Sequence, residues 1–271
     1  PLTSPHTPIV PSTRWQGKSS LGKYGDFLME TDWVVGEVLA ELAEQHFSRD
    51  TIVIFTTDNG TSPAAKIDQL EAKGHIPSGP YRGCKATIFE GGHRVPFVLR
   101  WPDHVGKKTV CDQTISQVDF FRTVAEITGA KVPENAAEDS FSLLPLLEEP
   151  KLEAPVRPFT IHHSIDGSFA LRQGKWKLIF GPSSGGWVEP KPKEVNDDPA
   201  WPALQLYDLE ADIAEAENLW TKDSEKAGEL VNLMVQAIRD GRTTAGKKQS
   251  NEGYPDTFID RVKEAYPQLK P

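Results

Sequence analysis

An acid and an amide, Asp58 and Asn59, directly follow the apolar run TIVIF in the stretch TIVIFTTDNG. Their side chains offer a carboxylate and an amide carbonyl, oxygen ligands that suit Ca²⁺ or Mg²⁺ better than Zn²⁺. Gly60 then lets the backbone turn away without a further side chain. The same residue types are also favoured in ordinary turns. The stretch alone therefore predicts either a turn or half of a metal site.

Lys85 is the second candidate, in the segment YRGCKATIFEGGHRVP. Gly83 and Cys84 precede it and an apolar pair follows shortly after, so we expect a partly enclosed ammonium group that could bind an anion as a point charge. An isolated lysine is more often a solvated surface charge. His93 and Arg94 could orient Lys85 or a metal-bound carboxylate from behind.

Three histidines complete the set of candidates. His6 lies in SPHTP, where the flanking prolines restrict its backbone direction. His162 and His163 end the segment FTIHH. A lone histidine in a loop is usually uninvolved in chemistry, so none of these residues is a strong signal by itself.

The elements that must position these residues change in type along the chain. Apolar residues recur at helical spacing from Lys23 to about His46, and TIVIF and VPFVLRWP are typical of buried strands. A helix leading into a wholly apolar strand predicts an α/β fold with a mostly parallel sheet covered by helices. Ligands of such sheets bind beyond the carboxyl ends of the strands, where Asp58 and Asn59 stand.

A different pattern begins after a link rich in Pro, Glu and Lys. The short alternating segments FTIHH, SFALRQ, KWKLIF and LQLYDL predict antiparallel strands, with a hairpin turning at Gln173–Gly174 and a helix opening at Asp223. We expect three parts: residues 1–150 as part of an α/β catalytic domain, residues 157–245 as a smaller antiparallel sheet with one helix, and residues 246–271 as a loose tail.

Composition excludes some classes of function. The formal net charge of −9 argues against a nucleic-acid partner. No apolar run approaches the ~20 residues of a membrane-spanning helix, so no membrane span is expected. The two cysteines, Cys84 and Cys111, have neither disulfide-framework nor metal-site spacing.

In combination and order, PHTPIVPS, TDNG and RGCKATIFEGGHRVP resemble the type I sulfatases, the formylglycine-dependent members of the alkaline phosphatase superfamily. HHSIDGSFALRQGKWKLIF and LYDL extend the resemblance over roughly residues 1–240. It implies an alkaline phosphatase-like fold and hydrolysis of a sulfate ester, from a sulfated small molecule or a sulfated glycan, by a periplasmic or secreted protein.

The resemblance also implies a role for each candidate. Asp58 and Asn59 would bind Ca²⁺, or Mg²⁺ in its place. Lys85 would bind the sulfate group, and His6 would contact the sulfate and act as an acid toward the leaving oxygen. His162 and His163 would contact the substrate.

One part of the family pattern is missing. The nucleophile, a formylglycine made within C/S-x-P-x-R, has no counterpart here, because PSTR at Pro11–Arg14 lacks the preceding Cys or Ser. We therefore expect formylglycine upstream of Pro1, and we read the chain as the C-terminal portion of a sulfatase that is inactive in isolation.

Two alternatives stay open. One is a phosphodiester or phosphonate monoester hydrolase of the same superfamily. The other is a non-catalytic remnant that binds sulfated glycans. Asn59 argues against zinc-dependent relatives, because imidazole suits zinc better than an amide oxygen does.

Overall fold

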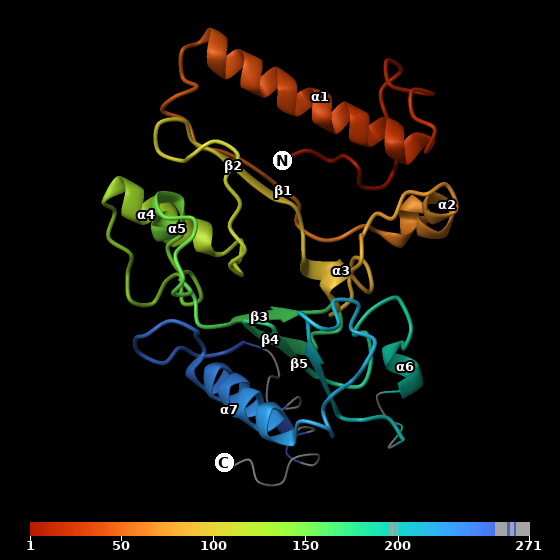
Figure 1. Ribbon diagram of the computed structural model, residues 1–271, viewed down its shortest axis with the longest axis vertical. Helices are drawn as coiled ribbons and strands as arrows, with labels where there is room; N and C mark the ends of the chain where they lie inside the picture. The colour runs from red at the N-terminus through yellow and green to blue at the C-terminus, as the bar shows by residue number, and fades with distance from the viewer. Residues whose placement is uncertain (196–197, 199, 253–258, 261–262, 264–271) are drawn as a thin grey trace.

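The computed structural model describes residues 1–195, 198, 200–252, 259, 260 and 263, which stack in layers along the long axis (Figure 1). Helix α1 (Lys23–Glu44) lies at one end, above the paired strands β1 (Val53–Thr56) and β2 (Phe97–Arg100). A sheet of four strands and helix α7 (Ser224–Asp240) lie at the other end. Short helices occupy the middle and the sides: η1 (Pro63–Ala65), α2 (Ile67–Glu71), α3 (Glu90–His93), α4 (Asp119–Thr128), α5 (Leu144–Glu148) and α6 (Pro192–Val195).

The first sheet differs from the expected parallel one. β1 and β2 pair antiparallel, with Val53 opposite Arg100 and Thr56 opposite Phe97. A parallel neighbour would require a crossover back to the start of β1. Residues 57–96 instead fold at the end where β1 finishes, so β2 runs back along it. Within the described residues the predicted mostly parallel sheet is therefore not found.

The predicted C-terminal antiparallel sheet is confirmed. Its strands are β3 (Thr160–His163), β4 (Phe169–Gln173), β5 (Trp176–Phe180) and β6 (Leu204–Asp208), hydrogen-bonded in that order with every pair antiparallel. The β4–β5 hairpin turns at Gly174–Lys175, one residue later than expected, and Gly174 has a φ of 56°. Glycine adopts this left-handed conformation without a steric cost.

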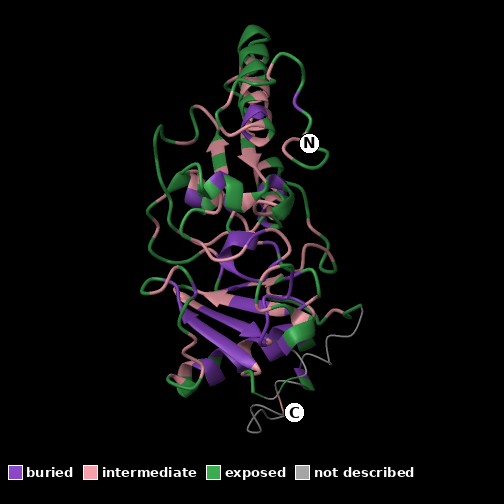
Figure 2. Ribbon diagram, turned by 90° about the vertical axis from the view of Figure 1, so that its right-hand side faces the viewer, coloured by how far each residue is buried: buried purple, intermediate pink, exposed green. Residues whose placement is uncertain are grey.

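The two faces of this sheet pack against different parts of the chain. Leu171, Leu178 and Leu206 lie in one core with α7. Their neighbours along the strands point the other way, and Ala170, Ile179 and Tyr207 form a second core with Ile88 and Phe89. Buried residues accordingly gather around this sheet, whereas most of α1 is exposed or intermediate (Figure 2). The sheet thus directly contacts the segment that leads into α3.

The helices begin and end for identifiable reasons. α1 begins at Lys23 as predicted, and the carboxylate of Asp26 in its first turn accepts hydrogen bonds from the Gly17 and Ser19 amides. α4 begins at Asp119, three residues after the expected cap Ser116, whose amide donates to the Asp119 carboxylate. α7 begins after Asp223, as predicted, and this carboxylate caps it by accepting from the Lys226 amide.

Part of the predicted loose tail contacts α7. The Lys248 ammonium lies 2.8 Å from the Asp240 carboxylate, and the Gln249 amide donates to the Asp240 carbonyl. The rest of that prediction falls mainly on residues 253–258, 261, 262 and 264–271, outside the described residues. Across the described part of the chain, no helix has both the length and the apolar character needed to cross a bilayer.

Candidate active site

The acid and the amide stand on a short loop at the end of β1. Asp58 is exposed, and its carboxylate makes no hydrogen bond or ion pair with another described residue. Asn59 is partly buried, and its Nδ2 donates to the Gly60 carbonyl at 3.2 Å. This bond uses the amide nitrogen and leaves Oδ1 as the available oxygen. Both side chains therefore present an unused oxygen.

This loop packs on α3 through glycine residues. The Gly60 amide donates to the Gly92 carbonyl at 3.1 Å. The approach is so close that a Cβ at Gly60 would lie 1.8 Å from the Gly91 carbonyl oxygen. Gly91 is itself hydrogen-bonded through its amide to the Arg82 carbonyl at 2.7 Å. α3 therefore acts as a support for the residue that follows Asn59.

A second backbone hydrogen bond brings Lys85 to the same loop. Its amide donates to the Thr61 carbonyl at 2.9 Å, three residues beyond Asp58. Next to it, Thr87 holds the turn by accepting from the Cys84 amide and donating to the Cys84 carbonyl. Lys85 is partly buried, and no ion pair joins its ammonium group to a described carboxylate. An anion would be a suitable partner for this charge.

His6 is exposed on the N-terminal segment, and within the described residues no hydrogen bond joins it to Asp58 or Lys85. Its Nδ1 donates to the Thr7 carbonyl at 2.8 Å, because a carbonyl can only accept. In the neutral ring this bond assigns the proton to Nδ1. Nε2 is then the nitrogen available for exchange of a proton with a bound molecule.

His162 and His163 lie in different surroundings. The His162 ring packs on His93, with ring centroids 4.4 Å apart, and its Nε2 lies 3.4 Å from the Ile88 carbonyl. His163 is exposed and contacts Phe169 edge-on. Burial lowers the pKa of His93 to about 4 and lowers that of His162 as well. Of the FTIHH pair only His163 is exposed, and the burial of part of its ring lowers its pKa as well.

Four charged residues, one at the start of α3 and three packed around it, were not identified as candidates from the sequence. Lys177 on β5 is fully buried and lies 3.0 Å from Glu90 and 2.8 Å from Glu215. Arg172 on β4 lies 3.1 Å from the other oxygen of Glu90. We call Glu90, Arg172, Lys177 and Glu215 the buried charge cluster. One feature of the sequence could have indicated the cluster: Lys177 lies within an otherwise apolar strand, WKLIF, where a lysine is buried only with a partner.

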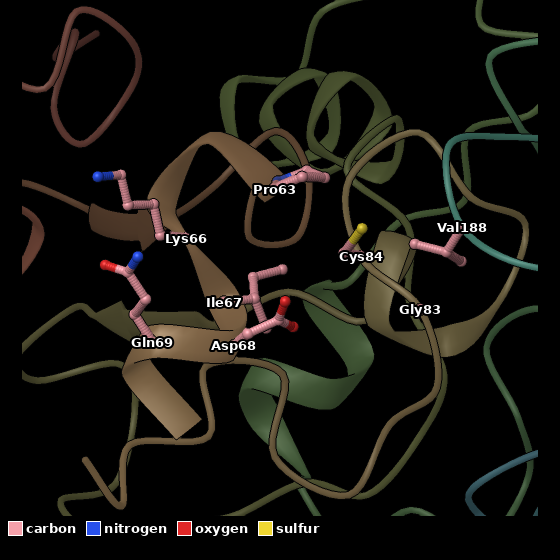
Figure 3. A pocket seen from close by; sticks show the side chains of 8 residues that line it. All are labelled: Pro63, Lys66, Ile67, Asp68, Gln69, Gly83, Cys84 and Val188. Atoms are coloured by element: carbon pink, nitrogen blue, oxygen red, sulfur yellow. The ribbon is translucent and has the colours of Figure 1, made fainter. Parts of the chain in front are cut away.

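A hollow of about 530 Å³ adjoins the Lys85 segment. Gly83 and Cys84 form one side of it, directly before Lys85, and Asp68 on α2 forms another. In Figure 3 the Asp68 carboxylate extends toward Cys84, whereas the Lys66 side chain extends away from it. The volume lies in the range of sites for small organic ligands.

Asp58 and Asn59 fit a hard divalent cation. Both offer oxygen atoms without a competing hydrogen-bond donor among the described residues, as Ca²⁺ and Mg²⁺ require. They do not make a complete site, because the described part of the chain holds no group of three or more His, Cys, Asp or Glu residues able to bind a metal. The two residues can supply only part of a coordination shell.

Two family models match the chain. The Sulfatase model matches residues 2–130, and a model described as N-sulphoglucosamine sulphohydrolase, C-terminal, matches residues 84–183. An N-acetylgalactosamine-6-O-sulfatase of Bacteroides thetaiotaomicron is 35% identical over 232 residues, covering 84% of this chain and 44% of that protein. Human steryl-sulfatase is 41% identical over 146 residues, covering 53% of this chain and 24% of that protein.

Solved structures of related proteins share the fold of this chain. A structure from work on glycosaminoglycan metabolism by Bacteroides thetaiotaomicron has a TM-score of 0.75 at 34% identity, covering 87% of this chain and 48% of that chain. A phosphonate monoester hydrolase of Agrobacterium radiobacter shares the fold, with a TM-score of 0.54 at 20% identity, covering 79% of this chain and 40% of that chain. The chain thus spans less than half the length of these relatives.

Proposed function

We propose that this chain, which belongs to the type I sulfatase family of the alkaline phosphatase superfamily, forms part of the active site of a sulfuric ester hydrolase. The observation that carries the proposal is the pair of backbone hydrogen bonds from Gly60 to Gly92 and from Lys85 to Thr61. Through them the segment that carries a carboxylate and an amide oxygen lies beside a second segment, which carries an ammonium group without a carboxylate partner among the described residues. Hydrolysis of a sulfate ester needs such groups, because charge builds on the sulfuryl and leaving oxygens.

Each residue has a role in this proposal. Asp58 and Asn59 hold Ca²⁺, or Mg²⁺ in its place, and a bound cation supplies positive charge beside the sulfate group. Lys85 binds a sulfate oxygen. His6 in its doubly protonated form donates the Nε2 proton to the leaving oxygen and becomes the neutral ring, which keeps its Nδ1 proton on the Thr7 carbonyl. His163 contacts the organic part of the substrate, and His162 contributes mainly through its packing on His93. The formylglycine nucleophile and the remaining metal ligands come from outside this chain.

The proposed substrate is a sulfated saccharide. The similarity to the N-acetylgalactosamine-6-O-sulfatase continues over 232 residues, whereas that to steryl-sulfatase covers 146. The hollow beside Gly83 and Cys84 offers room for the organic part of the substrate, and Asp68 can accept hydrogen bonds from hydroxyl groups there.

Export to the periplasm or the cell exterior is also part of the proposal and rests on family membership.

The proposal extends to the whole protein. There, β1 and β2 belong to a larger, mostly parallel sheet. Residues 1–150 form part of its catalytic domain, and residues 157–245 form the smaller C-terminal subdomain.

The test uses the whole protein that contains this chain. It is supplied with sulfated N-acetylgalactosamine, nitrophenyl sulfate, bis(nitrophenyl) phosphate and nitrophenyl phenylphosphonate, each with and without a chelator. We expect release of sulfate that the chelator abolishes. Faster release of nitrophenol from the phosphodiester or the phosphonate than from the sulfate would favour the phosphonate or phosphodiester hydrolase alternative. Binding of sulfated glycan without release of sulfate would favour the non-catalytic one.

A further inference from the structure

The buried charge cluster joins two parts of the chain that are distant in sequence. Lys177 on β5 has no exposed surface, and its Nζ lies 3.0 Å from Glu90 Oε1 and 2.8 Å from Glu215 Oε1. Arg172 Nη1 on β4 lies 3.1 Å from Glu90 Oε2. A third cation, the partly exposed Arg94, lies 3.7 Å from the same Glu90 oxygen, so positive charge surrounds this carboxylate on several sides.

A buried ion pair is a weak source of stability, because removing charges from water offsets most of their attraction. Apolar side chains already surround this place, since Ala170 and Ile179 next to the cations pack on Ile88 and Phe89. An apolar residue at position 177 would extend that core if Glu90 and Glu215 were replaced as well, because otherwise their carboxylates would stay buried without this cation. The cluster also fixes the orientation of the Glu90 carboxylate, because an ion pair with hydrogen bonds holds a carboxylate in one geometry.

The part held in this way is α3. Glu90 is its first residue, and besides its side-chain contacts its amide donates to Glu215 Oε2 at 2.7 Å. α3 has only four residues, too few to be stable as a separate helix. Its position therefore depends on contacts with its surroundings, and the cluster provides those at its first residue.

α3 in turn supports the loop of the candidate site. Gly60 donates to the Gly92 carbonyl and contacts Gly91 too closely for a Cβ. A shift of α3 would have to move Gly60 or break this bond. Asn59 and Asp58 precede Gly60 directly, and Lys85 is bonded to the following residue, Thr61.

We propose that Lys177 is a positioning residue that acts through Glu90 and α3 to place Asp58 and Asn59. That the placement serves to bind a metal ion rests on the proposed function. The mechanical link from β5 to the loop after β1 is a property of this chain alone.

Hydrogen–deuterium exchange on this chain tests the link. Lys177→Met removes the charge while keeping a long side chain, and Leu178→Val is the matched control, because it weakens the opposite face of the same strand. We expect Lys177→Met to speed exchange in residues 57–62 by at least about tenfold. We expect Leu178→Val to leave exchange there unchanged. Equal exchange in wild type and Lys177→Met, or an equal effect of Leu178→Val, would overturn the proposal.

Arg172→Gln provides a second variant if Lys177→Met does not fold. It removes the ion pair between Arg172 and Glu90 on the partly exposed side of the cluster. It should therefore also speed exchange in residues 57–62. No change in that segment would count against the proposal.

A calcium titration of the whole protein measures the consequence for the site. We expect the folded cluster variant to bind Ca²⁺ at least about tenfold more weakly, whereas Leu178→Val binds it as wild type does. Unchanged Ca²⁺ affinity in the cluster variant would overturn the role in placing Asp58 and Asn59. Absence of sulfatase activity in the wild-type protein would instead refute the proposed function, and the exchange experiment would still decide the link.

Discussion

Lys85 and Asp58 differ from the charged residues around α3 in that neither is paired with an opposite charge among the described residues. Lys177 and Arg172 each face a carboxylate within 3.1 Å, whereas the ammonium group of Lys85 and the carboxylate of Asp58 have no oppositely charged partner among the described residues. Charges without a partner within the fold, on two segments that a backbone hydrogen bond joins, are suited to bind ligands. At the scale of the residue, the proposed function therefore makes a separate prediction for each of them.

Replacement of Lys85 tests the anion-binding role. In the whole protein, Lys85→Ala should lower kcat/KM for sulfate ester hydrolysis by roughly 10²–10³, as expected for loss of one charge-stabilising group. Lys107→Ala, at an exposed lysine of the loop after β2, is the control and should change the rate less than twofold. Near-normal hydrolysis by Lys85→Ala would remove this residue from the site.

Replacement of Asp58 tests the metal-binding role. Asp58→Ala should lower the affinity for Ca²⁺ measured by calorimetry, because a negatively charged oxygen ligand is lost. Asp50→Ala is a matched control, since Asp50 is an exposed aspartate just before the other end of β1. Equal Ca²⁺ affinity of the Asp58 and Asp50 variants would contradict the assignment.

At the scale of the element, the site depends on the contact between one loop and one short helix. α3 has two glycines in four residues, and each is packed so closely against backbone that a side chain would clash. Glycine is unfavourable for helix stability. Here Gly91 and Gly92 let the backbone of residues 82–87 approach α3 closely, and Gly60 lets its own loop approach Gly91.

Substitution of Gly60 should separate this packing from general effects of glycine. Gly60→Ala places a Cβ 1.8 Å from the Gly91 carbonyl oxygen, so the loop must move, at a cost of about 1–3 kcal/mol in the free energy of unfolding. Gly36→Ala in α1 meets no atom within 4 Å and should stabilise the chain by roughly 0.5–1 kcal/mol. Urea unfolding measures both, and a Gly60 variant as stable as wild type would show that the contact is loose.

At the scale of the whole molecule, the C-terminal sheet has two roles. One face forms a core with α7, and the other holds the segment from Ile88 to His93. His93 and His162 meet where this segment crosses β3, and the His93 Nε2 is buried without a hydrogen-bond partner among the described residues. A proton on either ring would be poorly solvated there, so this contact should be sensitive to acid.

The pH dependence of stability follows from the lowered pKa of His93. Burial, assisted by the charge of Lys177, lowers this pKa from 6.5 to about 4. The unfolded chain therefore takes up the proton first as pH falls, and stability is lost between about pH 6.5 and 4, by up to about 3 kcal/mol. Urea unfolding at several pH values should show this loss.

The control is a second histidine. His93→Gln should reduce the slope between pH 7 and 5, and the part that remains should come from His162, whose pKa burial also lowers. His46→Asn should not, because His46 is exposed and its φ of 62° suits asparagine. An unchanged slope in the His93 variant would refute the explanation.

Much of the local structure could be predicted from the order of residue types. α1, the four C-terminal strands and α7 follow from hydrophobic periods of 3.6 and 2, which report the face that an element buries. The predicted parallel sheet was not found among the described residues, because a strand's apolar content reports burial and not the direction of its partner. The hairpin turn was predicted one residue early, since Gln173 still pairs with Trp176.

The candidate site divides in the same way. Asp58, Asn59 and Lys85 were identified from the sequence, because oxygen donors after a strand and a lysine among small residues are local patterns. The buried charge cluster was not, because its members come from α3, β4, β5 and the segment before α7, up to 125 residues apart. No local pattern specifies which carboxylate a buried lysine will meet.

The sequence alone therefore determined which residues of this protein are candidates for chemistry, which faces its helices and strands bury, and which family it resembles. Each of these depends on neighbours in the chain. Only the tertiary structure decided that the loop after β1 packs on the glycines of α3, and that α3 is held by a lysine of the C-terminal sheet. These contacts join distant segments through backbone groups and charged side chains. Such groups occur in every sequence, and their partners are fixed only when the chain has folded.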